Sequence, residues 1–184
     1  MHLLEIVDLS VSIGNKQVLK NFNLKIGQGE THALFGPNGT GKTTLLNVIA
    51  GIPRYTVEEG RIVFKGKDIT HMSMDERARL GIGMAFQRPP AIRGLRLKDL
   101  IKIINPKADA QEIMKKMDFS AFAERDVNRG FSGGEVKRSE MVQLLAQQPD
   151  FVMLDEPDSG VDLENIKLIG EAINTLTQKD LRPS

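Results

Sequence analysis

A glycine-rich segment near the N-terminus has the residue types and spacing of a phosphate-binding loop. Residues 36–43 read G-x-x-x-x-G-K-T, in which glycines let backbone N–H groups turn inward and cradle a triphosphate at a helix N-terminus. We expect Lys42 to reach the β and γ phosphates and the Thr43 hydroxyl to ligate Mg²⁺. The alternative is a turn that only joins a strand to a helix. The predicted phosphate contacts are Gly36, Pro37, Asn38, Gly39, Thr40, Gly41, Lys42, Thr43 and Thr44.

Two carboxylates follow a short apolar run at residues 151–154, which predicts a buried strand. In α/β sheets, ligands gather at the carboxyl ends of strands, so we expect Asp155 and Glu156 to lie near the phosphate loop. Asp155 would hold Mg²⁺ through its water shell, and Glu156 would orient and polarise an attacking water. The alternative is a loop with two solvated acids.

Two further groups could act on the same phosphates. Gln87 follows an apolar strand candidate at residues 82–86, so its amide can reach the γ phosphate or the metal. A second glycine turn, Ser132-Gly133-Gly134, precedes a helix that we expect from Glu135, and its hydroxyl and unpaired N–H groups offer another anion site. A plain helix cap is the alternative for this turn.

The pattern of apolar residues and turn residues predicts an α/β sandwich with a helical insert. Asp162 is expected to cap the last helix, whose apolar face carries Leu163, Ile166, Ile169, Ile173 and Leu176. The expected strands are 3–12, 18–26, 31–35, 61–64, 82–86 and 151–154, and the expected helices are 42–49, 97–104, 110–117 and 135–147.

Bulk composition excludes several classes of protein. The 184 residues suffice for one compact domain, and the net charge of +1 provides no global field for nucleic acid or an acidic membrane face. Cysteine is absent, which excludes disulfides and thiolate ligands on this chain. No stretch approaches the ~20 apolar residues of a membrane span, so we expect no direct membrane insertion and a soluble, cytoplasmic protein.

The motifs occur in the order found in ATP-binding-cassette (ABC) ATPases, and the resemblance covers essentially the whole chain. It implies an α/β P-loop NTPase core with an N-terminal antiparallel β subdomain and a small helical insert. The single domain 1–184 would divide into 1–87, 88–130 and 131–184. It also implies an ATP hydrolase that uses Mg²⁺, forms a homodimer on ATP binding, and presents Ser132, Gly133 and Gly134 to the ATP of the opposite subunit.

Within this family the chain resembles the ATPase subunit of Suf iron–sulfur cluster assembly. Four segments carry the resemblance: residues 51–60, 85–94, 133–138 and 158–162. It implies Suf-type scaffold proteins as partners. The ATPase subunit of a membrane transporter and a non-catalytic fragment that only binds a partner are the alternatives. A basic run between Arg77 and Lys102 is either a solvated helix face or a docking surface for the partner.

The chain departs from the family pattern at two places. Ile13, with Val11 beside it, stands near the position where many members stack an aromatic ring on adenine, so base recognition would rest on apolar contact. The family also continues into a strand with a switch histidine, and none of His2, His32 and His71 lies in that context. We therefore expect weak nucleotide binding and slow hydrolysis by these 184 residues.

Overall fold

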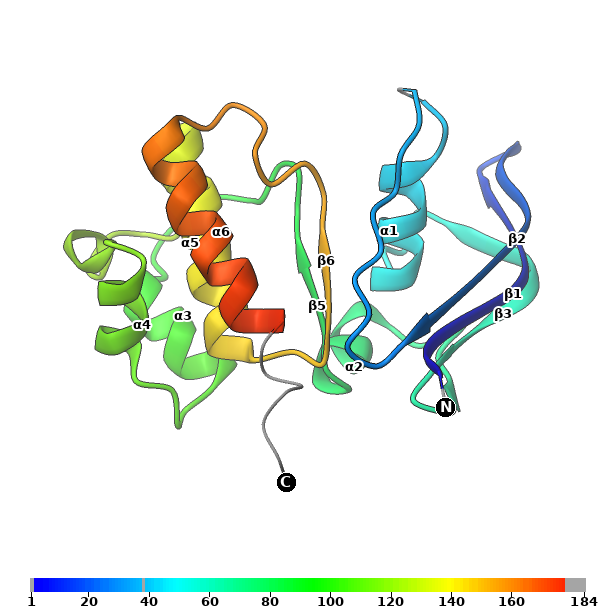
Figure 1. Cartoon of the computed structure of the whole chain (residues 1–184), viewed down its shortest axis with the longest axis horizontal. Helices are drawn as coiled ribbons and strands as arrows, with labels where there is room; N and C mark the ends of the chain where they lie inside the picture. The colour runs from blue at the N-terminus through cyan, green and yellow to red at the C-terminus, as the bar shows by residue number, and fades with distance from the viewer. Residues whose placement is uncertain (1, 38, 178–184) are drawn as a thin grey trace. The chain divides into compact units, whose positions relative to one another are not determined.

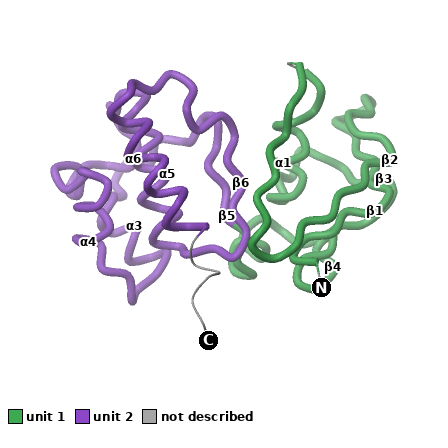
Figure 2. Tube along the Cα trace, in the orientation of Figure 1, with its two compact units in different colours: residues 1–82 green, residues 83–184 purple. Residues whose placement is uncertain are grey.

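The computed structural model describes residues 2–37 and 39–177, so the predicted phosphate contact Asn38 lies outside the described residues. The chain forms two compact units, residues 1–82 and 83–184 (Figure 2), and each is described by itself. The expected three-part division of a single domain stays a prediction.

The first unit contains a four-stranded antiparallel sheet in the order β2-β1-β3-β4 (Figure 1). Its register places Leu4 of β1 opposite Phe64 of β3 and Ile6 opposite Ile62, and all four side chains are buried. This agrees with the antiparallel β subdomain expected from the sequence. The strands are β1 (His2–Ile13), β2 (Lys16–Gly27), β3 (Thr56–Phe64) and β4 (Lys67–Asp68).

Two helices complete this unit, α1 (Lys42–Ala50) behind the phosphate loop and the short α2 (Met74–Arg79). A buried arginine of α2, Arg77, joins them. Its Nη1 donates to the carbonyls of Val48 and Ile49 at the end of α1, at 2.7 and 2.9 Å. The Val48 carbonyl also accepts from the Gly51 N–H at 3.1 Å. Arg77 supplies a donor to the Ile49 carbonyl, at the helix end where carbonyls lack partners inside the helix.

The predicted strand at residues 31–35 is not present in the structure. The segment forms no ladder with any strand of the described residues, and Phe35 is 92% exposed. A strand is stabilised by its neighbours' hydrogen bonds, so an apolar run without a neighbouring strand in the described chain stays irregular.

The second unit pairs β5 with β6 and packs helices around them. The bounds predicted at 97–104 and 151–154 are confirmed. The strand expected at 82–86 and the helix expected at 110–117 each end one residue earlier, and the helix expected from residue 135 begins at residue 133. The elements are β5 (Ile82–Ala85), α3 (Leu97–Ile104), α4 (Ala110–Lys116), a 3₁₀ turn (Ser120–Phe122), α5 (Gly133–Gln147), β6 (Phe151–Leu154) and α6 (Leu163–Thr177).

Aromatic rings anchor the start of α5 to the helical insert. Phe131, just before α5, meets Phe122 edge-on at 5.1 Å and Phe119 at 5.7 Å between ring centroids. Arg125 covers Phe131 and donates to the carbonyl of Gly130 at 3.0 Å. The insert thus fixes the chain that leads into the second glycine turn.

The apolar face predicted for α6 is buried only in part. Ile169 is buried in the core, and Ile173 and Leu176 pack against it, whereas Leu163 is 86% exposed and Ile166 39%. The apolar stripe therefore extends one turn beyond the part of α6 that packs on the core. No helix in residues 2–37 and 39–177 is long and apolar enough to cross a membrane.

One acid of α5 is buried together with a lysine. Glu140 is 4% exposed, and burial raises its pKa to about 6, although hydrogen bonding from Phe86 and the charge of Lys137 oppose that rise. The protonated carboxyl is therefore favoured in the folded state over the unfolded state, whose pKa is close to 4.5.

Replacing Arg77 should cost more stability than replacing a surface arginine of the same helix. Arg77→Met removes a donor that serves four backbone carbonyls, and we expect a loss of about 3 kcal/mol in the free energy of unfolding. Arg79→Met is the matched control, because Arg79 forms an exposed ion pair with Asp75. Its replacement should change stability by less than about 0.5 kcal/mol. Urea denaturation measures both, and equal losses would contradict the role of Arg77.

Glu140 should make stability depend on pH. Because its folded pKa is raised, its contribution is fully present below pH 4.5 and is lost as the pH rises through about 6. Relative to Glu140→Gln, which cannot titrate, the wild-type chain should lose about 2 kcal/mol over that window. Denaturation of both chains at several pH values tests this, and a constant difference between them would refute it.

Candidate functional site

The phosphate loop belongs to the first unit and begins α1. Gly41 is the N-cap of α1 with φ of 95°, and a Cβ there would lie 3.3 Å from Leu19 Cδ2. Only glycine adopts this left-handed conformation without strain, so the predicted glycine pattern has a local reason in the backbone. No acidic residue occupies the first turn of α1. No carboxylate of the first turn therefore neutralises the positive end of the α1 helix dipole.

Lys42 lies folded over the loop. Its Nζ donates to the carbonyls of Gly36 at 2.6 Å and Pro37 at 2.9 Å, and the Thr40 hydroxyl donates to the same Pro37 carbonyl at 2.9 Å. The ammonium is thus held within the loop that the sequence predicts to surround phosphates. Thr43 follows in α1, and the Thr44 side chain hydrogen-bonds with the Tyr55 hydroxyl.

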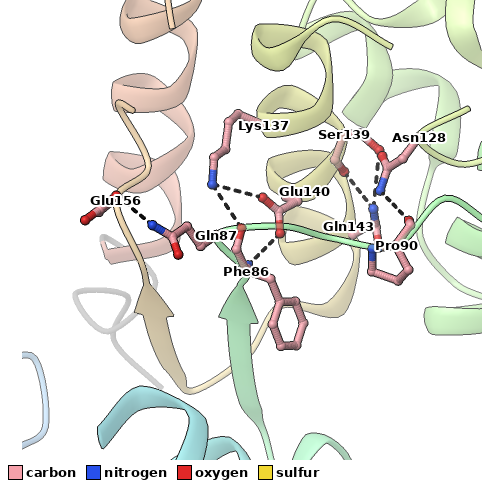
Figure 3. Close-up of polar contacts among 9 residues, drawn as sticks. All are labelled: Phe86, Gln87, Pro90, Asn128, Lys137, Ser139, Glu140, Gln143 and Glu156. Atoms are coloured by element: carbon pink, nitrogen blue, oxygen red, sulfur yellow. Dashed lines mark hydrogen bonds and ion pairs between the residues drawn. The ribbon is translucent and has the colours of Figure 1, made fainter. Parts of the chain in front are cut away.

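In the second unit, Gln87 and Glu156 are in contact. Gln87 follows β5 and Glu156 lies beyond β6, and the Gln87 Nε2 donates to Glu156 Oε2 at 2.9 Å (Figure 3). The two strand arrows point the same way in that view, so both residues leave the sheet at its carboxyl end. The structure brings these two predicted residues together.

The two acids differ in environment. Asp155 is 5% exposed and its N–H donates to the carbonyl of Ala85 at 3.4 Å, whereas Glu156 is exposed. Glu156 also has φ of 49°, a conformation that is strained for a residue other than glycine. Such strain persists only where the surroundings impose it, and it often marks functional sites.

Sequence reasoning missed a buried pair of charges behind this contact. Glu140 Oε1 accepts from the Phe86 N–H at 2.6 Å, and Lys137 Nζ donates to the Phe86 carbonyl at 2.9 Å (Figure 3). A lysine and a glutamate three residues apart in a helix usually form a solvated pair. The available signal is that Lys137 falls on the helix face of Met141 and Leu144, which are buried.

The second glycine turn is a helix cap. Ser132 and Glu135 form a capping box, in which the Ser132 N–H donates to Glu135 Oε2 at 2.7 Å and the Glu135 N–H donates to the Ser132 hydroxyl at 3.3 Å. Gly134 has a separate packing role, because a Cβ there would lie 2.8 Å from Asn165 Nδ2. Asp162 accepts hydrogen bonds from the Asn165 side chain at 2.7 Å and N–H at 2.9 Å, which confirms it as the predicted cap.

The predicted metal ligands are hard oxygen donors. A Thr43 hydroxyl, an Asp155 carboxylate and the Gln87 amide oxygen suit Mg²⁺, and the Gln87 nitrogen already points to Glu156. Within residues 2–37 and 39–177, His, Cys, Asp and Glu side chains form no group of three or more that could hold a metal. Mg²⁺ on a nucleotide takes oxygen ligands from phosphate and water as well.

Two predictions near the site need correction. Val11 is fully buried in the sheet, so of the two apolar residues considered for the base only Ile13, at 36% exposed, lies at the surface. The basic run between Arg77 and Lys102 also exposes less unpaired positive charge than the number of its basic residues indicates. Arg77 is buried, Arg96 pairs with Asp99 at 2.6 Å, and further ion pairs join Arg96 and Lys98 to Glu124.

Known proteins share both the sequence and the fold of this chain. The sequence profile of the ABC transporter family matches residues 19–159. A probable ABC transporter ATP-binding protein of Streptococcus pyogenes serotype M3 is 40% identical over 98% of this chain and 76% of its own length. A probable ATP-dependent transporter, ycf16, of Pyropia yezoensis is 41% identical over 96% of this chain and 77% of its own length.

Solved structures agree with these relatives. A nucleotide-free ATP-binding cassette from an ABC transporter matches with a TM-score of 0.80 at 28% identity, over 97% of this chain and 78% of the other. A second cassette, solved as a dimer in a post-hydrolysis state with ADP and Pi, matches with a TM-score of 0.80 at 25% identity, over 96% of this chain and 84% of the other. The fold is the α/β P-loop core expected from the sequence, and the chain belongs to the ABC ATPase family.

Proposed function

We propose that this protein binds Mg-ATP between two head-to-tail copies of the chain and hydrolyses it. The observation that supports the proposal most is the phosphate loop itself, with left-handed Gly41 at the start of α1 and Lys42 held over the loop carbonyls. Exchange of those carbonyls for phosphate oxygens would give Lys42 a charged partner, and a charge-assisted hydrogen bond is stronger than one to a neutral carbonyl. Closure of the two copies would do work, and hydrolysis would let them part.

The other predicted residues take roles that follow from their chemistry. Thr43, Asp155 and Gln87 would hold Mg²⁺ directly or through water, and the metal would supply positive charge to the phosphates. Glu156 orients a water and accepts its proton as general base. Its contact with Gln87 supports this role, because the amide fixes the carboxylate at the end of β6. The proposed catalytic set is Lys42, Gln87 and Glu156.

The second glycine turn is proposed to close the site of the opposite copy. Ser132, Gly133 and Gly134 begin α5, where helix N–H groups favour an anion. A related cassette was solved as a dimer with ADP and Pi, which supports a two-copy arrangement. Each copy would then supply a phosphate loop to one nucleotide and a capping turn to the other.

For the partner, we propose a Suf-type scaffold for iron–sulfur cluster assembly, with a cytoplasmic location. Support comes from the four sequence segments that resemble the Suf ATPase subunit. The names of several relatives favour a second candidate, the ATPase subunit of a membrane transporter. Arg88, Ile92 and Arg93 are exposed in the loop after Gln87, where the family docks its partner.

A mixing experiment tests ATP hydrolysis between copies. Lys42→Ala and Ser132→Arg should each abolish hydrolysis, because the first removes the phosphate cation and the second blocks the turn that faces the nucleotide. In a mixed dimer, one of the two sites keeps both residues. Mixing equal amounts of the two inactive chains should therefore make up to about a quarter of all sites active, and the rate of hydrolysis should reach up to about a quarter of the wild-type rate.

The control for this experiment is each variant mixed with itself, measured by phosphate release. Binding of a fluorescent ATP analogue shows whether Lys42→Ala has lost the nucleotide or only turnover. If the mixture stays as inactive as its parts while both variants remain folded, Ser132 does not act across the dimer. If Lys42→Ala hydrolyses ATP normally, the phosphate loop has no part in the reaction.

Charge reversal in the exposed loop tests the partner. Arg93→Glu should weaken capture of the partner at least about tenfold while ATP binding is unchanged, because rim charges govern association. Arg96 is unsuitable, since its reversal would break the pairs with Asp99 and Glu124. Lys20→Glu on β2 is the matched control. Capture of a β-rich scaffold without detergent supports the Suf proposal, and a partner that needs detergent supports the transporter.

A further inference from the structure

We infer that Lys137 and Glu140 are positioning residues: they hold the backbone N–H and carbonyl of Phe86, and so set the place of Gln87 and, through it, of Glu156. We call Phe86, Lys137 and Glu140 the Phe86 latch. This inference deepens the proposed function and rests on it.

Two side chains of α5 supply hydrogen-bond partners for both backbone polar groups of Phe86. Phe86 donates its N–H to Glu140 and accepts at its carbonyl from Lys137, at 2.6 and 2.9 Å, and the two charged groups lie 3.5 Å apart. The side chains of Lys137 and Glu140 are only 7% and 4% exposed. With little water to compete, these charge-assisted hydrogen bonds hold the backbone on both sides of the Phe86 Cα in one orientation.

The position of the latch in the chain gives it a consequence for the site. Phe86 is the first residue after β5, and Gln87 is the second. A peptide that leaves a strand loses the ladder that fixed its direction. The latch replaces the ladder at that point, so the direction of the Gln87 side chain toward Glu156 depends on two residues of α5.

Stability alone does not account for two buried charges. Their removal from water costs several kcal/mol each, and apolar residues of similar size often replace such a pair without loss. What apolar residues cannot provide is a donor and an acceptor for the Phe86 peptide. The latch therefore selects one geometry for the chain entering Gln87.

The latch also links that geometry to the second glycine turn. Ser132 caps α5, and Lys137 and Glu140 follow five and eight residues later in the same helix. This is about 8 to 12 Å along a rigid helix axis. Any displacement of α5 that accompanies closure of the capping turn would be passed to Phe86, and thus to Gln87.

A double-mutant cycle tests whether the latch acts through Gln87. Lys137→Met removes the donor to the Phe86 carbonyl, and we expect kcat to fall at least about tenfold with KM for ATP changed less than about twofold. In a Gln87→Ala background the same substitution should cause no further fall. An equal fall in both backgrounds would show that Lys137 serves the fold alone and would overturn the inference.

The acid of the latch offers a second, isosteric comparison. Glu140→Gln keeps a carbonyl oxygen for the Phe86 N–H, whereas Glu140→Leu does not. We expect the glutamine variant to retain clearly more of the wild-type kcat than the leucine variant. Equal kcat values for these two variants would count against the latch.

A readout without ATP separates this inference from the proposed function. In the nucleotide-free chain, NMR of the Gln87 side-chain amide and hydrogen exchange of the Phe86 N–H report the latch directly. Glu140→Leu should shift the Gln87 amide and speed Phe86 exchange at least about tenfold, and unchanged signals would overturn the latch. If these signals change as expected while the wild-type protein hydrolyses no ATP, the latch stands and the proposed function fails.

Discussion

Buried backbone groups at the ends of short elements need partners, and in both units a buried charged side chain supplies them. Arg77 donates to the last carbonyls of α1 in the first unit. In the second unit, Lys137 and Glu140 hydrogen-bond to the backbone carbonyl and N–H of Phe86, the residue that follows β5. Each arrangement fixes an element that carries predicted site residues, because a buried backbone group without a partner is costly and the charged side chain supplies that partner in one geometry.

The sequence predicts the elements well where the pattern is local. The helix over 97–104 and the strand over 151–154 have the expected bounds, because apolar spacing and turn residues suffice to define them. The segment 31–35 reads equally well as a strand and yet forms none. A strand depends on a neighbour, and no pattern within five residues can supply one.

The candidate site was predictable as residue types but not as contacts. The loop motif and the two acids are visible in the sequence because their chemistry requires fixed residue types at fixed spacing. The hydrogen bond between Gln87 and Glu156 joins residues 69 positions apart, and the sequence suggests only a common sheet edge. The burial of Lys137 and Glu140 was not foreseen, because composition treats a charge as solvated unless tertiary contacts are known.

The absence of a side chain at Gly134 ties together the starts of two helices. Asn165 of α6 fills the space above this glycine and is itself held by Asp162. The first turns of α5 and α6 consequently share one corner, with few independent degrees of freedom. The two helix starts therefore stay in a fixed relation, and any side chain larger than hydrogen at Gly134 would have to displace Asn165 and so disturb both of them.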